Sequence, residues 1–598
     1  MTKPDARTLM VRSLNETRLL HPPTYVASRL LADSIASEAT SGWTPEAVLR
    51  KFPLQRTPRL FEIVRLKKAP PGQQLEYRHY LIPSPRTSLA EAITLSELAT
   101  TAPFRKSNRV FSHLWPRSPD YPYNFQYYLS GYKRRNRAIA AAFRRYPARI
   151  AVVTDIRRFY PSIRHDLLRD RFYSALDQSD VAVPIRDTAG MLLHHITAHF
   201  KGRGIATGPE FSHTLANVLL AQADRDLETR YPQSYFRYVD EIILVVDRRD
   251  QNSASQRIAA VLGDLGLELN ADKTDVVSSE EWLGHGPPYR PASRKSFQAL
   301  VFRLKLYIAL RPHRFGELSS AFAAEGFNIP LGRIRTASTA GRFRKAVELY
   351  HQRGWKVVLE ALLDTPASLA RSAHQLRVNF LSRLSSLAAV AVPDGPTRRR
   401  WHVNRIRFLT NRLLYLAPIS EWGLISEAIS ALPEFADTNA LLRLLRSGDV
   451  STLLNMPGPA VTAAASLLHQ IEGPRGQVEL PSNLTFPQIH SASILLLFGV
   501  ARGPVEGAFQ TSESARDFLA FCSGQSRAVR SRNDFTYLDE IQSAEIIPNH
   551  DDFVEERLER DFFRLKRTVR RLHNERPALK PGFNGRNNRF YSSSSLRF

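Results

Sequence analysis

Three acidic residues stand where a buried strand would otherwise be apolar. Asp155 ends the apolar run Ile150–Thr154, and Asp240 and Glu241 interrupt the aromatic, β-branched segment YFRYVDEIILVV. Burying a carboxylate is costly unless it pairs with a base or binds a metal ion. Phosphoryl transfer supplies such a reason, because two cations about 3.5–4 Å apart must be held by carboxylates. Each acid alone is explained by an ion pair or a hairpin tip, but two such sites in order favour a metal centre.

Two further segments could complete such a centre. GRGIATGPEFSHTLANVLLAQADRDLE lies between the acidic sites, and its Gly204, Gly208 and Pro209 predict a turn that lets the backbone approach a substrate. A helix with Ser212 near its start follows that turn. Beyond the second acidic site, LGLELNADKTDVVSSEEWLG predicts a helix end, a turn and a strand that bears Lys273.

An earlier hairpin could add positive charge. FEIVRLKK and EYRHYLIP flank APPGQQL, which predicts a β-hairpin from Phe61 to Pro83 with a proline-glycine turn. Arg78, with Lys67 or Lys68 across the turn, could clamp a triphosphate, because a guanidinium matches the geometry of phosphate oxygens.

A basic, aromatic stretch separates this hairpin from Asp155. In VFSHLWPRSPDYPYNFQYYLSGYKRRNR, aromatic rings could stack on bases while Lys133, Arg134 and Arg135 hold phosphates. A core-packed helix with a basic face explains the same segment equally well.

Three histidines, His194, His195 and His199, lie close together in MLLHHITAHF. The last two have the i,i+4 spacing of a helix face, but no Glu or Cys is placed to complete a zinc site. We therefore interpret them as a helix face near nucleic acid.

Composition sets the broad class of protein. The 598 residues allow about three to five domains. The net charge of +26 attracts polyanions such as nucleic acid. A single cysteine excludes an intramolecular disulfide and a cysteine-cluster zinc site. Without a long apolar run or an apolar start, the sequence predicts a soluble, cytoplasmic protein with no membrane partner.

The second half of the chain has a helical texture. After about Gln298, leucine-rich pieces such as LRVNFLSRLSSLAAV and RIRFLTNRLLYLA have the apolar spacing of packed helices, without a fixed repeat. The basic final stretch, which ends in SSSSLRF, is interpreted as a tail that lies on nucleic acid or is loose.

Taken together, the segments between about residues 60 and 290 resemble the motif series of reverse transcriptases. The Asp155 segment is similar to motif A, GIATGPEFSHTLAN to motif B, YVDE to motif C, GLELNADKT to motif D and WLG to motif E. A full series in order is specific, whereas a single match would be weak.

The resemblance implies an α+β fold of the right-hand polymerase type, with fingers and palm followed by a large α-helical C-terminal domain. The expected divisions are 1–150 for the N-terminal segment and fingers, and 151–297 for the palm, with part of the fingers inserted at about 165–203. Residues 298–545 are expected to form the helical thumb or C-terminal domain, and 546–598 the basic tail.

The resemblance also implies roles for single residues. Asp155 and Asp240 would hold two Mg²⁺ ions, with Mn²⁺ as an alternative, and Lys273 would act near the pyrophosphate. Tyr160 falls at the steric-gate position, which makes deoxynucleotides the expected substrate, although an ordinary packed tyrosine is the simpler explanation of this residue alone. The residues expected to line the template and the incoming nucleotide are Gly208, Pro209, Ser212 and Asn217.

One position departs from the family pattern. Motif C of reverse transcriptases ends in two aspartates, and the second is Glu241 here. We expect Glu241 to remain a metal ligand, with oxygens displaced by the added methylene, so that metal placement and product choice change.

The overall plan indicates which reverse transcriptases are most similar. No ribonuclease H acid set, HNH module or protease accompanies the motifs, and a long helical region follows them, as in bacterial abortive-infection (antiphage defence) reverse transcriptases. That resemblance implies RNA-guided, protein-primed or untemplated DNA synthesis, and a non-coding RNA, a partner defence protein or a second copy of the chain as partner. Two alternatives remain, a retron or group II intron-like enzyme acting on its own RNA and an inactive polymerase-like nucleic-acid-binding protein.

Overall fold

A four-stranded sheet in the computed structural model joins the segments that carry the acidic residues. Its strands β3 (Ile150–Asp155), β4 (Tyr235–Tyr238), β5 (Glu241–Val246) and β6 (Asp275–Ser278) lie in the order β4-β5-β3-β6, and all neighbours are antiparallel. Their β-branched and aromatic residues favour extended structure. The strands expected at 150–154 and within 236–246 are therefore confirmed.

The structure describes most of the chain up to residue 502. The described residues are 3–18, 21, 24, 28, 44–51, 53–54, 56, 60–68, 76–287, 292–327, 331, 362–447, 449–456, 458–468 and 477–502. The basic tail expected at 546–598 lies outside them.

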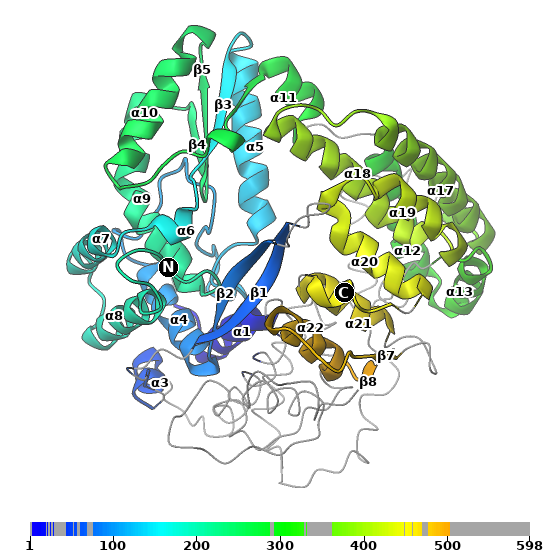
Figure 1. Ribbon diagram of the computed structural model, residues 1–598, viewed down its shortest axis with the longest axis horizontal. Helices are drawn as coiled ribbons and strands as arrows, with labels where there is room; N and C mark the ends of the chain where they lie inside the picture. The colour runs from blue at the N-terminus through cyan, green and yellow to red at the C-terminus, as the bar shows by residue number, and fades with distance from the viewer. Residues whose placement is uncertain are drawn as a thin grey trace.

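Helices cover both faces of the sheet, which explains why the central strands β3 and β5 are apolar on both sides (Figure 1). On one face, Ala151 and Val153 share a core with Phe143 of α5 (Tyr128–Arg145) and with α11 (Ser279–His285). On the other, Val152 and Leu244 join the largest core, to which α9 (Glu210–Arg230) and α10 (Gln251–Gly263) contribute.

The N-terminal part supplies a hairpin and the helices beneath it. Strands β1 (Leu60–Lys68) and β2 (Glu76–Pro83) pair antiparallel, with Arg65 opposite Arg78. The nearby helices are α1 (Ala6–Arg18), α3 (Pro45–Lys51) and α4 (Pro85–Leu98). The strands of the expected hairpin are confirmed, whereas its proline-glycine turn at 69–75 lies outside the described residues.

Helices of different lengths connect the strands of the sheet. Between β3 and β4 lie α6 (Phe159–Ser162), α7 (His165–Asp177), α8 (Val183–Thr197) and α9. Before β6 comes η2 (Ala271–Lys273), a 3₁₀ turn. The expectation that the strand itself bears Lys273 was wrong, because η2 places this lysine two residues before the strand begins.

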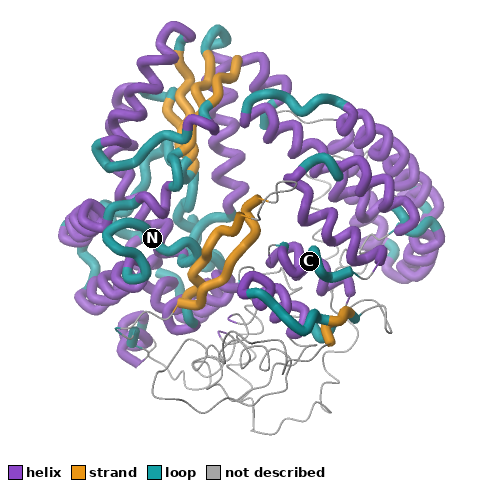
Figure 2. The backbone as a smooth tube through the Cα atoms, viewed as in Figure 1, coloured by secondary structure: helices purple, strands orange, loops and turns teal. Residues whose placement is uncertain are grey.

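The second half is mainly helical in the described residues, as the sequence predicted (Figure 2). Its helices are α12 (Ala292–Leu310), α13 (Phe315–Ala324), α17 (Pro366–Ala389), α18 (Pro396–Leu416), α19 (Trp422–Ile429), α20 (Ala436–Ser447), α21 (Gly458–Leu468) and α22 (Phe486–Leu497). Two short strands, β7 (Val478–Glu479) and β8 (Ala501–Arg502), pair in parallel.

These helices form two groups. Helices α12, α13 and α17–α19 enclose a core of their own, whereas α21 and α22 join the large core that also contains α1. The second half thereby packs against the first at more than one place (Figure 1). None of the described helices is long and apolar enough to cross a membrane.

Candidate active site

The end of β3 and the β4–β5 turn bring Asp155 and Asp240 together. Asp155 is the last residue of β3, and Asp240 lies in the two-residue turn whose first residue, Val239, has φ of 58°. The Ile156 N–H donates to the Asp240 carbonyl oxygen over 3.0 Å, which fixes the turn against the end of β3. Lys273 Nζ donates to Asp155 Oδ1 over 2.9 Å.

This pair of carboxylates carries negative charge that is only partly offset. Burial first, and then the charge of Asp155, raise the pKa of Asp240 to about 6, while Lys273 lowers it. Such an imbalance is what a bound cation relieves. The part of the chain that the structure describes holds no group of three or more His, Cys, Asp or Glu able to bind a metal. Two carboxylates nevertheless suit Mg²⁺, which takes its other ligands from water and substrate phosphates.

Glu241 has different partners from the aspartates. It pairs directly with Asp155 in the register of β3 and β5, but its buried carboxylate accepts from Arg135 Nη1 of α5 and, over 2.5 Å, from Arg400 Nη2 of α18. Burial opposes ionisation, yet these two arginines outweigh it and lower the pKa of Glu241. We expected this carboxylate among the metal ligands, whereas the structure gives it two guanidinium partners.

A buried arginine joins the turn to the preceding helix. Arg237 Nε and Nη2 donate to the two carboxylate oxygens of Asp224 in α9 over 2.6 and 2.7 Å. Arg237 Nη1 donates to the Val239 carbonyl over 2.8 Å, inside the turn that carries Asp240. Arg237 and Asp224 were not among the residues predicted from the sequence, although an arginine within an apolar strand and an aspartate close after the run LANVLLA were visible signals.

The same arginine accounts for Asn217. Its Oδ1 accepts from Arg237 Nη2 over 3.0 Å, and its Nδ2 donates to the His213 carbonyl over 2.7 Å. Asn217 was expected to line the substrate, but its amide is engaged within the protein.

The turn before α9 supports the nearby hairpin. Gly208 has φ of 133°, and a Cβ there would lie 2.4 Å from the Leu81 carbonyl oxygen. Leu81 N–H donates to the Thr207 carbonyl over 2.8 Å, so that β2 rests directly on the turn. Pro209 follows, and α9 begins at the next residue. Ser212, expected to face the substrate, is fully buried, and its Oγ has no hydrogen-bond partner in the described part of the structure.

Tyr160 is held by an aromatic stack. Its hydroxyl lies 2.6 Å from His213 Nδ1, and the His213 ring stacks on His113 with 3.8 Å between ring centroids. Burial first, and then Lys106, lower the pKa of His213 to about 4, so the imidazole is neutral at neutral pH. Burial first, and then the charge of Asp240, raise the pKa of Tyr160. Sequence reasoning did not identify His113 or His213.

One known family matches the part of the chain that contains these residues. Residues 98–287 match the family model described as reverse transcriptase (RNA-dependent DNA polymerase). The match indicates an RNA-directed DNA polymerase. Such a domain is a nucleotidyltransferase that acts on nucleic acid and deoxynucleoside triphosphates, and reverse-transcriptase domains generally use divalent metal ions. No curated protein sequence matches the chain.

Two solved structures are similar to this chain at low identity. Telomerase from Candida albicans with a TWJ fragment of telomeric RNA is 11% identical, with a TM-score of 0.26, over 64% of this chain and 66% of that one. Apo telomerase from Candida tropicalis is 9% identical, with a TM-score of 0.27, over 60% of this chain and 69% of that one. Because these TM-scores are low, no residue of this chain is matched to a residue of either telomerase.

The basic residues expected to hold phosphates differ in how exposed they are. Arg78 on β2 is exposed. The side chains of Lys67 and Lys68 lie outside the part of the chain that the structure describes. Lys133 is exposed on α5, whereas Arg135 is buried against Glu241. The α5 segment therefore behaves as a core-packed helix with a basic face.

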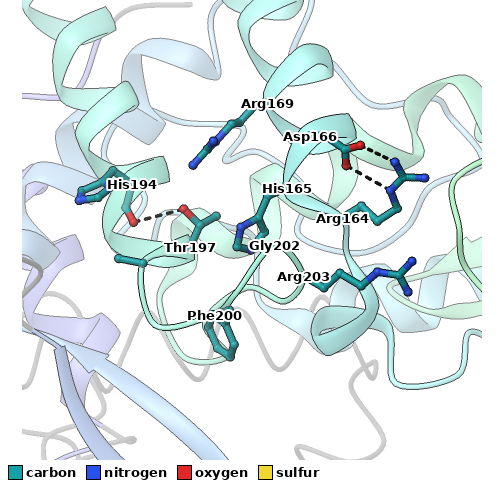
Figure 3. Close-up of a pocket in the computed structure, with 10 residues that line it drawn as sticks. Arg164, His165, Asp166, Arg169, His194, Thr197, Phe200, Gly202 and Arg203 are labelled. Atoms are coloured by element: carbon teal, nitrogen blue, oxygen red, sulfur yellow. Dashed lines mark hydrogen bonds and ion pairs between the residues drawn. The ribbon is translucent and has the colours of Figure 1, made fainter.

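A basic cavity of about 590 Å³ lies between the start of α7 and the end of α8 (Figure 3). Arg164, Arg169 and Arg203 line it, and Arg164 pairs with Asp166. His194 also lines this cavity. None of the predicted site carboxylates, Asp155, Asp240 and Glu241, is among its lining residues. Of the other two predicted histidines, His195 is buried and His199 is exposed.

Proposed function

We propose that this chain is a reverse-transcriptase-type DNA polymerase that adds deoxynucleotides by two-metal phosphoryl transfer. The observation that carries the proposal is the Asp155–Asp240 pair within a domain that matches reverse transcriptases. Mg²⁺, or Mn²⁺ in its place, is the cation we propose for these carboxylates. When bound, two such ions neutralise phosphate charge and activate the attacking hydroxyl.

The chain's own residues then orient the substrates. Arg237 and the Ile156 N–H hold the turn that carries Asp240, and Tyr160 supports the sugar from a fixed ring position. Lys273 lies at Asp155, where its charge can stabilise the pyrophosphate that leaves. Exposed Arg78 on β2 is available to clamp the triphosphate.

The test is metal-dependent nucleotide incorporation by the purified full-length chain. Asp155→Asn and Asp240→Asn should each abolish incorporation while circular dichroism shows an unchanged fold. Wild-type rates in a folded Asp240→Asn protein would contradict the assignment of the site. A wild-type chain that incorporates nothing, with any template, primer or metal, would instead support the inactive nucleic-acid-binding alternative.

We further propose that the enzyme acts in bacterial antiphage defence. The support is architectural, namely the extensive helical region that follows the reverse-transcriptase domain. Expression in a phage-challenged host should lower plaque formation, and Asp155→Asn should remove that protection. Sequencing the DNA made by the protein, and any RNA that copurifies with it, separates templated from untemplated synthesis. A discrete bound RNA would favour the retron-like alternative.

A further inference from the structure

Helix α18 docks on the edge of the sheet through its first turns. Arg398 Nη1 donates to Asp275 Oδ1 of β6 over 3.0 Å, and its Nε donates to Glu281 Oε1 of α11 over 2.8 Å. One turn along, the Trp401 ring packs edge-on against Trp282 with 5.4 Å between centroids. The second half of the chain is therefore attached directly beside the strand that follows Lys273.

Arg400 lies within this contact and reaches the carboxylate next to Asp240. Its Nη2 lies 2.5 Å from Glu241 Oε1, and its charge also interacts with that of Asp155. The Arg400 side chain is 45% exposed, whereas that of Glu241 is 11% exposed. One guanidinium from the helical half thus lies beside the carboxylates of the catalytic sheet.

Arg135 holds the other side of the same carboxylate. Its side chain is 1% exposed, and its guanidinium lies over the rings of Tyr132 and Tyr238. Among the described residues, Glu241 is the acid to which Arg135 donates a hydrogen bond. A buried arginine needs a charge partner, and removing that partner leaves an uncompensated charge.

Side-chain length explains why a glutamate stands here. Glu241 begins β5, directly opposite Asp155, yet its oxygens meet guanidinium groups from two different helices. An aspartate on the same backbone would be one methylene shorter and could not reach both partners without a shift of β5. The departure from the family motif is thereby matched by two arginines, 106 and 159 positions away along the chain.

We propose that Glu241 is a positioning residue that couples the docking of α18 to the catalytic turn. Its carboxylate is shared between Arg135 and Arg400, so the helical half sets the position of the strand that begins immediately after Asp240. The catalytic centre is complete only when α18 is docked. The kinetic part of this inference rests on the proposed polymerase function, whereas its structural part does not.

The first experiment is structural and needs no activity. Hydrogen exchange of the full-length protein is measured over residues 396–404 in Glu241→Gln, Arg400→Met and the double variant. Each single change should speed exchange by on the order of tenfold. The double variant should add little to this, because both single changes remove the same contact. Arg399→Met is the control: Arg399 also lies on α18, but it pairs with Glu434 outside this helix, so its loss should speed exchange over residues 396–404 much less than Arg400→Met does. Unaltered exchange in Arg400→Met would show that the Arg400–Glu241 ion pair does not hold α18 in place, and would overturn the proposal.

The second experiment separates a positioning residue from a metal ligand. Arg400→Met keeps the Glu241–Arg135 pair, so it remains informative even where Glu241→Gln does not fold. We expect both variants to lower kcat by on the order of tenfold, with the half-saturating metal concentration within about twofold of wild type. Arg400→Lys should recover part of the loss, and Glu241→Asp should behave like Glu241→Gln.

The opposite pattern would identify Glu241 as a metal ligand. In that case Glu241→Gln raises the half-saturating metal concentration by on the order of tenfold or more, whereas Arg400→Met leaves both parameters unchanged. An inactive wild-type chain would count against the polymerase function alone. The hydrogen-exchange result would then still decide whether Glu241 joins the two halves.

Discussion

At the scale of single residues, Asp240 in the β4–β5 turn and the adjacent Glu241 at the start of β5 have opposite electrostatic environments. Burial and the charge of Asp155 raise the pKa of Asp240, whereas Arg135 and Arg400 outweigh burial and lower that of Glu241. A raised carboxyl pKa marks a charge that the folded protein disfavours, and a lowered one marks a charge that it stabilises. Adjacent residues of the same chemical type are therefore not interchangeable.

The contrast predicts opposite effects on stability. In metal-free buffer at neutral pH, Asp240→Asn should leave the melting temperature unchanged or raise it, because an unfavourable charge is removed. Glu241→Gln should lower it by several degrees, since two arginines lose their counter-charge. Thermal unfolding by circular dichroism measures both. A stabilised Glu241→Gln protein would contradict the ion pairs described above.

The pKa of Asp240 also predicts a pH dependence. Below about pH 6 this carboxyl is protonated and no longer a good metal ligand. Incorporation at fixed, subsaturating Mg²⁺ should therefore fall as the pH drops through about 6, and added metal should restore it. Stability changes in the opposite direction, because between pH 3.8 and about 6 the folded state binds a proton that the unfolded state does not. A metal affinity that is flat from pH 5 to 8 would speak against Asp240 as a ligand.

Sugar selectivity should depend on the Tyr160 ring rather than on its hydroxyl. Tyr160→Ala should admit ribonucleotides by opening space beneath the sugar, with little loss for deoxynucleotides. Tyr160→Phe keeps the ring and loses only the bond to His213, so it should retain most of the discrimination. Steady-state kcat/KM ratios for dNTP and rNTP measure the effect. Unchanged ratios in Tyr160→Ala would make this tyrosine a core residue.

At the scale of elements, the sequence pattern predicted those strands and helices that neighbouring residues determine. The apolar runs of β3 and β5, the hairpin strands and the helix after Gly208 follow from residue types that favour them over a few positions. The partners of Arg237, Glu241 and Tyr160 could not be predicted in the same way. Those side-chain contacts mostly join residues of different elements, between 13 and 159 positions apart, and periodicity within one element contains no information about them.

The turn before α9 offers a test at this scale. Gly208→Ala should severely reduce both activity and stability, because its Cβ would meet the Leu81 carbonyl at 2.4 Å and the backbone has φ of 133°. Gly263→Ala is the matched control, since a Cβ at that helical glycine has open space around it. The control should be neutral or slightly stabilising. Chemical denaturation and incorporation assays compare the two, and equal behaviour would mean that β2 does not rest on this turn.

At the scale of the whole molecule, two features matter for function: the net charge, and the contact between the two halves of the chain. The chain carries a net charge of +26, which favours polyanions whatever their sequence. Composition predicted that partner class, and the motif series predicted which segments come together at the end of β3. Neither could show that the helical half contributes a side chain beside Glu241 and Asp155, because α18 follows Glu241 by more than 150 residues.

The last prediction therefore concerns removal of the second half. A fragment that ends at residue 287 loses Arg400 from Glu241, Arg398 from Asp275 and Glu281, and the Trp401 ring from Trp282. We expect it to be inactive even where circular dichroism shows a folded sheet and helices. The full-length double variant Arg398→Met/Trp401→Ala should lose activity too, which separates loss of docking from loss of mass. An equally active fragment would show that the helices from α12 onward serve another purpose, such as strand binding or self-association.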